Sequence, residues 1–308
     1  MHVGVFLPIS GRAAGPGTLM EAAKKAEALG FHAVWAADRV VIPWEIHTSY
    51  PYSDDNQFIV PPDRPFLDPL TCLAFLAGCT DKIVLGMSVL VLPYRHPLHW
   101  AKIMSTLDHL SRGRTVLGVG VGWLKEEFEA LGVPFDDRGS RSDEQLQILR
   151  QLWDRRHPRS QGRYYRFDNV AFYPKPLQKP RIPLWVGGEG MQAQRRAGRH
   201  GDAWFPYFVN ITPKELASRF DRVRYWALEA GRSESDVRLC CCLPVELTGQ
   251  PVNQEEGRLK GDAVQLVEAL KAYEEVGVEH LALQFMTPRW PDRSEQIERF
   301  GQDVLPAF

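Results

Sequence analysis

Cysteine is scarce in this sequence, and its spacing excludes two common classes of small domain. Five cysteines occur in 308 residues, and none forms a Cys-x-x-Cys pair. Structural zinc sites and disulfide frameworks need regular spacings, so neither is expected, and a reducing, cytoplasmic location fits best. Residues 240–242 are three consecutive cysteines in an apolar run, for which packing inside a strand is the simplest interpretation.

Excess charge and long apolar runs are absent as well. Lys and Arg together number 37, Asp and Glu number 38, and the net charge is −1. Binding to nucleic acid or to an anionic membrane needs a surplus of basic residues, so no such partner is expected. No apolar run reaches the roughly 18 residues of a membrane span, and the first residues lack the basic segment of a secretory signal.

The sequence does contain a regular alternation of short apolar segments with segments of helical spacing. The apolar segments predict strands at 3–7, 33–37, 83–91, 115–121, 183–187, 203–206, 237–247 and 278–285. Helices are predicted at 18–29, 68–79, 98–110, 126–131, 142–153, 191–199, 213–230, 262–276 and 293–304. Gly30 and Asp68 are expected to cap helices. Eight such strand–helix units favour an α/β fold, a single (β/α)8 TIM-barrel domain over residues 1–308.

Two connections are too long for ordinary turns. Residues 40–67 follow the second strand and contain several aromatic side chains, including Trp44, whereas residues 155–181 follow a helix. Long ordered loops are usually functional, and the loops that follow barrel strands surround the active site. The loop 40–67 is therefore expected at the mouth of the barrel, with Trp44 lining the pocket.

A glycine-rich turn is the clearest candidate for an anion site. Gly187, Gly188 and Gly190 lie between a predicted strand and the helix that begins near Met191. Backbone N–H groups and the helix dipole favour a phosphate at such a turn, provided that the Glu189 carboxylate points away. A tight turn without a ligand stays open as the alternative.

A second glycine pattern occurs in the fourth strand. Gly118, Gly120 and Gly122 alternate, so they face one side of the strand. A flat group or another backbone can approach such a face closely. A planar ligand and tight packing inside the barrel are both compatible with this pattern.

Polar residues at other strand ends are further candidates. Asp38 and Arg39 follow the second strand, Ser88 interrupts the apolar third strand, and His96 follows it. Active sites form at the carboxyl ends of barrel strands, but an ion pair, a buried hydroxyl and a structural histidine explain the same residues. The ligand set of a metal-dependent barrel hydrolase is missing, so no metal site is expected. The strand lysine of a Schiff-base aldolase is missing as well, so that chemistry is not expected either.

Together, several segments resemble the bacterial luciferase-like monooxygenase superfamily, and within it the deazaflavin-dependent oxidoreductases that use coenzyme F420. The similarity is strong from Val3 to about Phe205 and weaker beyond. The matching segments are 26–31, 92–97, 107–114, 118–123, 132–135 with 138–139, and 183–188.

The resemblance implies a homodimer of barrels that each hold a flavin-type ring at the mouth. It also implies a non-proline cis peptide between Ser88 and Val89, which backs the ring. The residues it assigns to the cofactor are Asp38, Ser88, Val89, Gly120 and Gly122, with Gly187, Gly188, Gly190 and Met191 at its phosphate. The expected substrate pocket comprises Arg39, Trp44, His96 and Trp123.

Two positions depart from part of this superfamily. Its sugar-phosphate dehydrogenases carry a histidine and a glutamate where this sequence has Arg39 and Trp123. Their acid/base pair is therefore missing, and the catalytic residues stay unassigned.

Three functions are compatible with the resemblance. The first is hydride transfer between F420, an 8-hydroxy-5-deazaflavin, and a small organic substrate. The second is an FMN-dependent monooxygenase that uses oxygen, and the third is a barrel that binds such a cofactor without turnover. A separate flavin or F420 reductase is the expected partner, since the cofactor supplies the chemistry and must be recycled.

Overall fold

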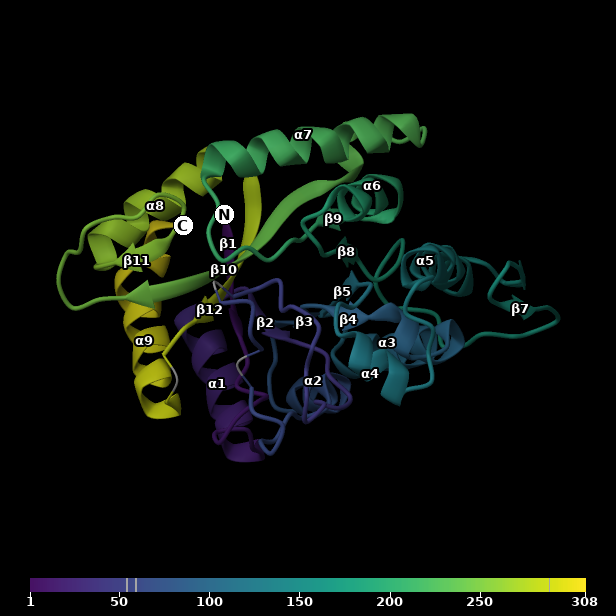
Figure 1. The fold of residues 1–308 in the computed structure, drawn as a ribbon, viewed down its shortest axis with the longest axis horizontal. Coiled ribbons are helices and arrows are strands. Elements are labelled where there is room, and N and C mark those ends of the chain that lie inside the picture. The colour runs from purple at the N-terminus through teal and green to yellow at the C-terminus, as the bar shows by residue number, and fades with distance from the viewer. Residues whose placement is uncertain (54, 59, 288) are drawn as a thin grey trace.

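The eight strands predicted from the sequence form a closed barrel. The computed structural model describes residues 1–53, 55–58, 60–287 and 289–308. Within them the barrel strands pair in parallel, and β9 pairs with β10 to close the ring (Figure 1). These strands are β1 (His2–Phe6), β2 (Ala33–Ala36), β3 (Val84–Met87), β5 (Thr115–Gly120), β8 (Leu184–Val186), β9 (Ala203–Trp204), β10 (Arg238–Leu247) and β12 (Val278–Phe285). The TIM-barrel prediction is therefore confirmed.

The helices surround these strands (Figure 1). Gly30 ends α1 in the left-handed conformation, with φ 88°, and the Asp68 carboxylate accepts the Thr71 N–H at 2.8 Å, so both predicted caps are confirmed. In the described part of the chain, no helix combines the length and apolarity needed to cross a membrane. The helices are α1 (Pro16–Leu29), α2 (Pro69–Ala77), α3 (Pro97–Leu110), α4 (Lys125–Ala130), α5 (Arg138–Asp154), α6 (Met191–His200), α7 (Pro213–Glu229), α8 (Ala263–Glu275) and α9 (Trp290–Asp303).

The third strand, predicted as residues 83–91, is broken in the structure. β3 pairs with β2, Ser88 and Val89 then interrupt the ladder, and β4 (Leu90–Val91) pairs with β5. Ser88 is the one polar residue at the break, and a single polar residue in an apolar run does not by itself predict that the strand ends. Several short elements were not predicted, because two or three residues are too few to show a period. They are β6 (Ser160–Gln161), β7 (Arg166–Phe167), β11 (Leu259–Gly261), η1 (Leu92–Tyr94), η2 (Glu234–Asp236) and η3 (Leu305–Ala307).

Aromatic rings fill the middle of the barrel. The centroid of the Trp35 ring lies 5.1 Å from that of Trp185 and 4.6 Å from that of Phe205, and its indole N–H donates to His280 Nε2 at 3.1 Å. Gly86 makes this possible, because a Cβ at this position would overlap the Trp35 ring. The packed centre separates the two ends of the barrel and leaves open space at the carboxyl ends of the strands.

Candidate active site at the mouth of the barrel

A cavity of about 460 Å³ opens at the carboxyl ends of the barrel strands. Its size suits a small molecule, and this end of a barrel is where active sites form. Every barrel strand contributes to it, through residues that lie in the strand or follow it: Leu7, Asp38, Ser88, Gly122, Gly188, Tyr207, Cys242 and Met286.

Val89 is a wall residue of the cavity that sits between two glycines. A Cβ on Gly120 would lie 2.6 Å from Val89 Cγ2, and one on Gly187 would lie 2.9 Å from Val89 Cγ1. Protein interiors do not tolerate such approaches, so a larger residue at either position would displace Val89. The Ser88–Val89 peptide bond is cis, as the family resemblance implied. At Gly118 the glycine serves tight packing inside the barrel, because a Cβ added there would overlap the Met87 carbonyl.

Asp38 places a buried carboxyl at the cavity. Its Oδ2 accepts the Val91 N–H at 3.0 Å, while Oδ1 has no hydrogen-bond partner among the described residues. Burial raises the pKa of Asp38 to about 6, although the Val91 N–H and the Arg95 guanidinium, 3.8 Å away, act to lower it. Buried polar atoms are normally hydrogen-bonded. An N–H donor on a bound ring would satisfy this oxygen.

Arg39 lines the cavity as a fixed cation. Its guanidinium donates to Glu127 Oε2 at 2.8 Å and lies over the Trp123 ring, 4.8 Å from the centroid. Tyr94 donates its hydroxyl to the same Glu127 oxygen at 2.6 Å. Arg39 and Trp123 both line the cavity where the sequence predicted them. Arginine is a poor proton donor in proteins. Arg39 and Trp123 therefore form a fixed part of the cavity wall, at the positions where the sugar-phosphate dehydrogenases carry an acid/base pair.

Two successive carboxylates at the start of α4 hold the long loop against the mouth of the barrel. Glu127 Oε1 accepts the Val40 N–H at 2.7 Å, and Glu126 Oε1 accepts the Thr48 N–H at 2.9 Å. The Thr48 hydroxyl also donates to Glu126 Oε2 at 2.7 Å. The predicted position of this loop at the mouth is confirmed, since it supplies cavity residues Tyr50, Tyr52, Phe58, Val60, Pro61 and Phe66.

Glu189 is a cavity residue to which sequence reasoning assigned no role. Its Oε1 accepts the Tyr207 N–H at 3.3 Å, so the mostly buried side chain reaches toward a segment other than α6. Burial raises the pKa of this carboxyl to about 7, against the lowering effect of the Tyr207 N–H and of a hydrogen bond from Tyr52. The available signal was an acidic residue inside a glycine-rich turn that ends a barrel strand.

The glycine-rich turn has the backbone that its composition predicts. Gly188 has φ 98°, a conformation that favours glycine, and Gly190 precedes α6 without a side-chain cap. Gly187 and Gly188 line the cavity, whereas Gly190 and the 69% exposed Met191 lie outside its lining. Binding of a phosphate at the start of α6 stays a prediction.

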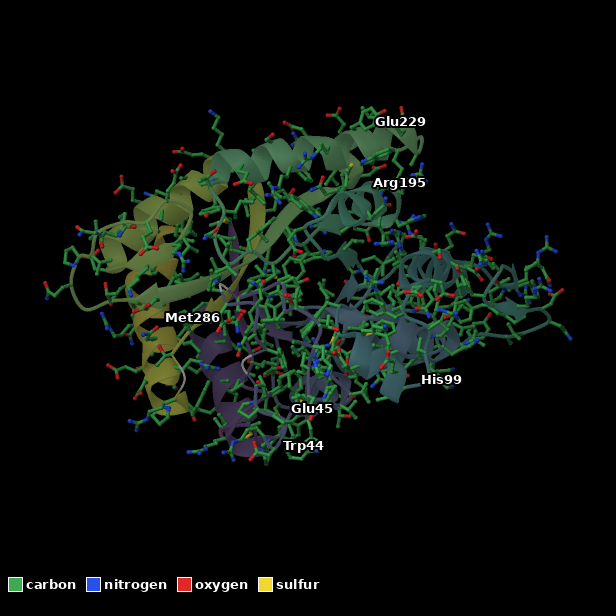
Figure 2. All side chains as sticks on the ribbon, viewed as in Figure 1. Trp44, Glu45, His99, Arg195, Glu229 and Met286 are labelled. Atoms are coloured by element: carbon green, nitrogen blue, oxygen red, sulfur yellow. The ribbon has the colours of Figure 1, made fainter. Side chains whose placement is uncertain are left out.

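Trp44 was predicted to line the pocket, and the structure places it elsewhere. Its side chain is 80% exposed. Figure 2 shows it beside Glu45 at the lower edge of the molecule, apart from the cavity residue Met286. The backbone on either side is held by α4, at Val40 and Thr48, which leaves the intervening turn on the outer side of the loop.

His96 was also predicted to face the substrate, and it caps a helix instead. Its Nδ1 accepts the Leu98 N–H at 3.2 Å at the start of α3. The ring packs edge-on against Tyr165, 5.1 Å between centroids. A capping imidazole whose nitrogen is engaged by the backbone does not belong to the cavity lining, and His96 is outside it.

Ser88 lies in the cavity wall beside a cysteine. Its hydroxyl is 3.3 Å from Cys242 Sγ. All three cysteines at 240–242 are buried, in keeping with the packing interpretation, but Cys242 also forms part of the cavity wall. Burial raises the pKa of the Cys242 thiol, so the group stays protonated and uncharged at neutral pH.

Comparison with known proteins identifies the family. The family model described as luciferase-like monooxygenase matches residues 1–251. An uncharacterised protein of Mycobacterium tuberculosis is 34% identical over 211 residues, 68% of this chain and 72% of that protein. The phthiodiolone/phenolphthiodiolone dimycocerosates ketoreductase of the same species is 29% identical over 264 residues, 83% of this chain and 68% of that protein.

Solved structures share the fold at lower identity. The coenzyme F420 dependent tetrahydromethanopterin reductase from Methanopyrus kandleri superposes with a TM-score of 0.76 at 21% identity, over 100% of this chain and 99% of that chain. An F420-dependent secondary alcohol dehydrogenase superposes with a TM-score of 0.79 at 20% sequence identity. The match covers 99% of this chain and 98% of that chain. A monooxygenase from Streptomyces bottropensis superposes with a TM-score of 0.74 at 19% sequence identity, over 99% of each chain. With the sequence match spanning most of its length, the chain belongs to the luciferase-like monooxygenase family, a family of oxidoreductases.

Proposed function

We propose that this protein is an F420-dependent oxidoreductase that transfers hydride between the deazaflavin and a small, mostly apolar carbonyl compound or alcohol. The observation that carries the proposal is the cavity itself, in which aromatic and apolar walls surround two carboxyls, Asp38 and Glu189, whose pKa values burial raises toward neutrality. Such groups can hold or accept a proton near pH 7. The names of two similar proteins, a ketoreductase and an alcohol dehydrogenase, support the same class of reaction.

The residues at the mouth fit a flavin-type cofactor. A bound deazaflavin supplies hydride transfer without oxygen chemistry. Val89, seated against Gly120 and Gly187, offers the ring a fixed apolar surface. Asp38 would accept a ring N–H through its unpartnered Oδ1, and the turn at Gly188 would hold the phosphate through backbone N–H groups.

The loop over the mouth determines what kind of substrate fits. Tyr50, Phe58 and Phe66 present rings to the cavity, while Arg39 is neutralised by Glu127. Rings of this kind exclude water and favour apolar compounds. An uncharged ketone or secondary alcohol matches this lining better than a sugar phosphate does.

Titration of the purified protein with F420 and, separately, with FMN tests the proposal. We expect saturable binding of F420, at least about tenfold tighter than binding of FMN, which corresponds to about 1.4 kcal/mol. Reduced F420 should then be oxidised by ketones in the absence of oxygen. A protein that does not bind F420 would overturn the proposal.

An FMN-dependent monooxygenase is the second candidate, because the monooxygenase from Streptomyces bottropensis has the same fold. This function predicts oxygen uptake that requires reduced FMN and an organic substrate, and that observation would replace the F420 proposal. Tight F420 binding combined with no oxidation of reduced F420 by any ketone would instead indicate a storage role.

A further inference from the structure

Glu189 lines the cavity, and a backbone N–H of a neighbouring segment orients its side chain. It follows β8, and its Oε1 accepts the Tyr207 N–H at 3.3 Å. The nearby Tyr52 hydroxyl acts to lower the pKa of the same carboxyl. The rings of Tyr52 and Tyr207 contact each other, with centroids 5.4 Å apart. A carboxyl held in this way has a defined orientation in the cavity wall.

The surroundings of Glu189 favour its protonated form. Burial, the largest effect, raises its pKa to about 7, and the distant Arg219 of α7 only partly opposes this. The tyrosines and thiols around it bring no charge at neutral pH, because burial raises the pKa of each. The titratable groups that face it are Tyr50 and Tyr52 of the long loop, Tyr207 after β9, Cys241 and Cys242 of β10, and Arg219.

Two other acidic groups that the structure describes near the cavity already have partners at one or both oxygens. Glu127 accepts hydrogen bonds from Arg39 and Tyr94. Asp38 accepts the Val91 N–H, and the proposed function uses its second oxygen for the cofactor ring. Among the described residues that line the cavity, Glu189 is therefore the carboxyl left for a substrate.

We infer that Glu189 is the proton donor of the reaction and delivers its carboxyl proton to the oxygen of a carbonyl substrate. This inference rests on the proposed function. The carbonyl carbon gains a hydride from the anionic form of reduced F420, and the carbonyl oxygen gains the Glu189 proton as the C=O π bond opens. The products are the alcohol, oxidised F420 and the Glu189 carboxylate, which regains a proton from water. In the direction of alcohol oxidation the same carboxylate accepts the hydroxyl proton.

Steady-state reduction of acetophenone by reduced F420 tests the role of this carboxyl. Glu189→Gln keeps the size of the side chain and removes the acid, and we expect kcat to fall about 100-fold or more, as for other general acids. The wild-type rate should fall as the pH rises through about 7, since the protonated acid is then lost, and the variant should lack this limb. Tyr52→Phe removes a hydroxyl that lowers the pKa of Glu189, so this fall in rate should move to higher pH.

Glu144→Gln is the matched control. Glu144 also accepts backbone N–H groups, including that of Tyr165 at 2.8 Å, but it lies outside the cavity lining. We expect its kcat and pH profile to match those of the wild type. Equal melting temperatures of the two glutamine variants would exclude a general loss of folding.

A second readout needs neither cofactor nor substrate. Infrared difference spectra of the unloaded protein should show a carboxylic acid signal that disappears as the pH rises through about 7. This signal should be absent from Glu189→Gln and retained in Asp38→Asn, which distinguishes the two acids of the cavity.

The two experiments separate the inference from the proposal on which it rests. If Glu189→Gln retains kcat and the pH profile while binding F420 normally, or if the infrared signal persists in that variant, the proton-donor role is overturned and the proposed function stands. If the wild-type protein does not bind F420, the proposed function fails, and the donor role fails with it even where the infrared signal behaves as expected.

Discussion

Val89 keeps its place in the cavity wall because Gly120 and Gly187 have no side chains. The alternation of glycines in the sequence indicates that something lies close against one face of the strand. It does not identify the occupant, which proves to be a valine from the neighbouring strand end. The same clearance is what a ring bound at the mouth would depend on.

Gly120→Ala tests this clearance. The new Cβ would lie 2.6 Å from Val89 Cγ2, so the valine must move into the cavity, at a cost of about 1–3 kcal/mol typical of overpacking. We expect F420 binding to weaken by about tenfold or more, measured by fluorescence titration. Gly17→Ala is the control, since open space surrounds Gly17 in α1 and alanine favours helix. Unchanged F420 affinity in Gly120→Ala would contradict the role of Val89.

Asp38→Asn tests the buried carboxyl. Because the pKa of Asp38 is raised from 3.8 to about 6, the native state binds more protons than the unfolded state between these values, and ionisation of Asp38 destabilises the fold as the pH rises. The variant should therefore gain stability relative to wild type between about pH 4 and 7, by up to about 3 kcal/mol. Urea unfolding at several pH values measures this. A difference that does not change with pH would contradict the raised pKa.

The residues of the site that the sequence predicted well are those at strand ends. Asp38, Ser88 and Gly188 follow strands whose direction the apolar pattern already defines, so their placement at the mouth follows from the barrel. Trp44 lies in a loop whose direction depends on hydrogen bonds to α4, and Glu189 depends on contacts with distant tyrosines. Such contacts between remote segments leave no periodic trace in the sequence.

At the scale of elements, α4 acts as the anchor of the long loop. Its first turn carries Glu126 and Glu127, whose carboxylates accept N–H groups from that loop. Hydrogen bonds lower the pKa of Glu126 to about 2, although desolvation opposes them. A six-residue helix is thereby tied to a segment that lies roughly eighty residues earlier in the chain.

Glu126→Ala is expected to release the loop. Hydrogen bonds to a charged group contribute about 1.5–3 kcal/mol, and their loss should raise the rate of proteolytic cleavage in the loop by roughly 10- to 100-fold where opening precedes cleavage. Limited proteolysis with mass spectrometry locates the cuts. Glu129→Ala, on the same helix but paired with Lys125, should be cleaved like the wild type. Equal cleavage of both variants would show that Glu126 does not anchor the loop.

Element types were largely predictable, and element ends and breaks were less so. The residues predicted for β12 match the structure, and α3 differs by one residue at its start. The apolar pattern alone predicted one continuous strand over 83–91, whereas the family resemblance implied the cis peptide at Ser88–Val89, where the strand breaks. Backbone geometry at such a break depends on the neighbouring strands rather than on local composition.

At the scale of the whole molecule, a column of histidines packs beside the centre of the barrel. The rings of His2 and His32 stack 4.1 Å apart, and His32 meets His280 at 5.4 Å. Burial, with His2 and Arg238 nearby, lowers the pKa of His32 to about 4, and burial lowers that of His280 further. His32 and His280 must therefore be neutral in the native state at neutral pH.

The column predicts that acid weakens the fold before the carboxylates are protonated. Unfolded histidine has a pKa near 6.5, so the unfolded state binds more protons than the native state between about pH 6.5 and 4, and stability falls as the pH falls through this window. His32→Gln should flatten this dependence in urea unfolding. The raised pKa values of Asp38 and Glu189 make the fold more stable as the pH falls, which opposes the effect of the histidines. The free energy of unfolding is therefore compared between variant and wild type at each pH. An unchanged slope would contradict the prediction.

The long loop is fastened at both ends, and none of its described residues in between joins the ladder of a barrel strand. Thr48 is tied to α4 at one end, and at the other Leu67 N–H donates to the Ile9 carbonyl at 2.8 Å. The loop rings that line the cavity lie between these fastenings, whereas Val89 and the glycine-rich turn belong to the barrel. Under the proposed function, substrate selection and cofactor binding would depend on separate segments of the chain. Replacing the segment between the two fastenings with that of a relative would then change substrate selection and preserve cofactor binding.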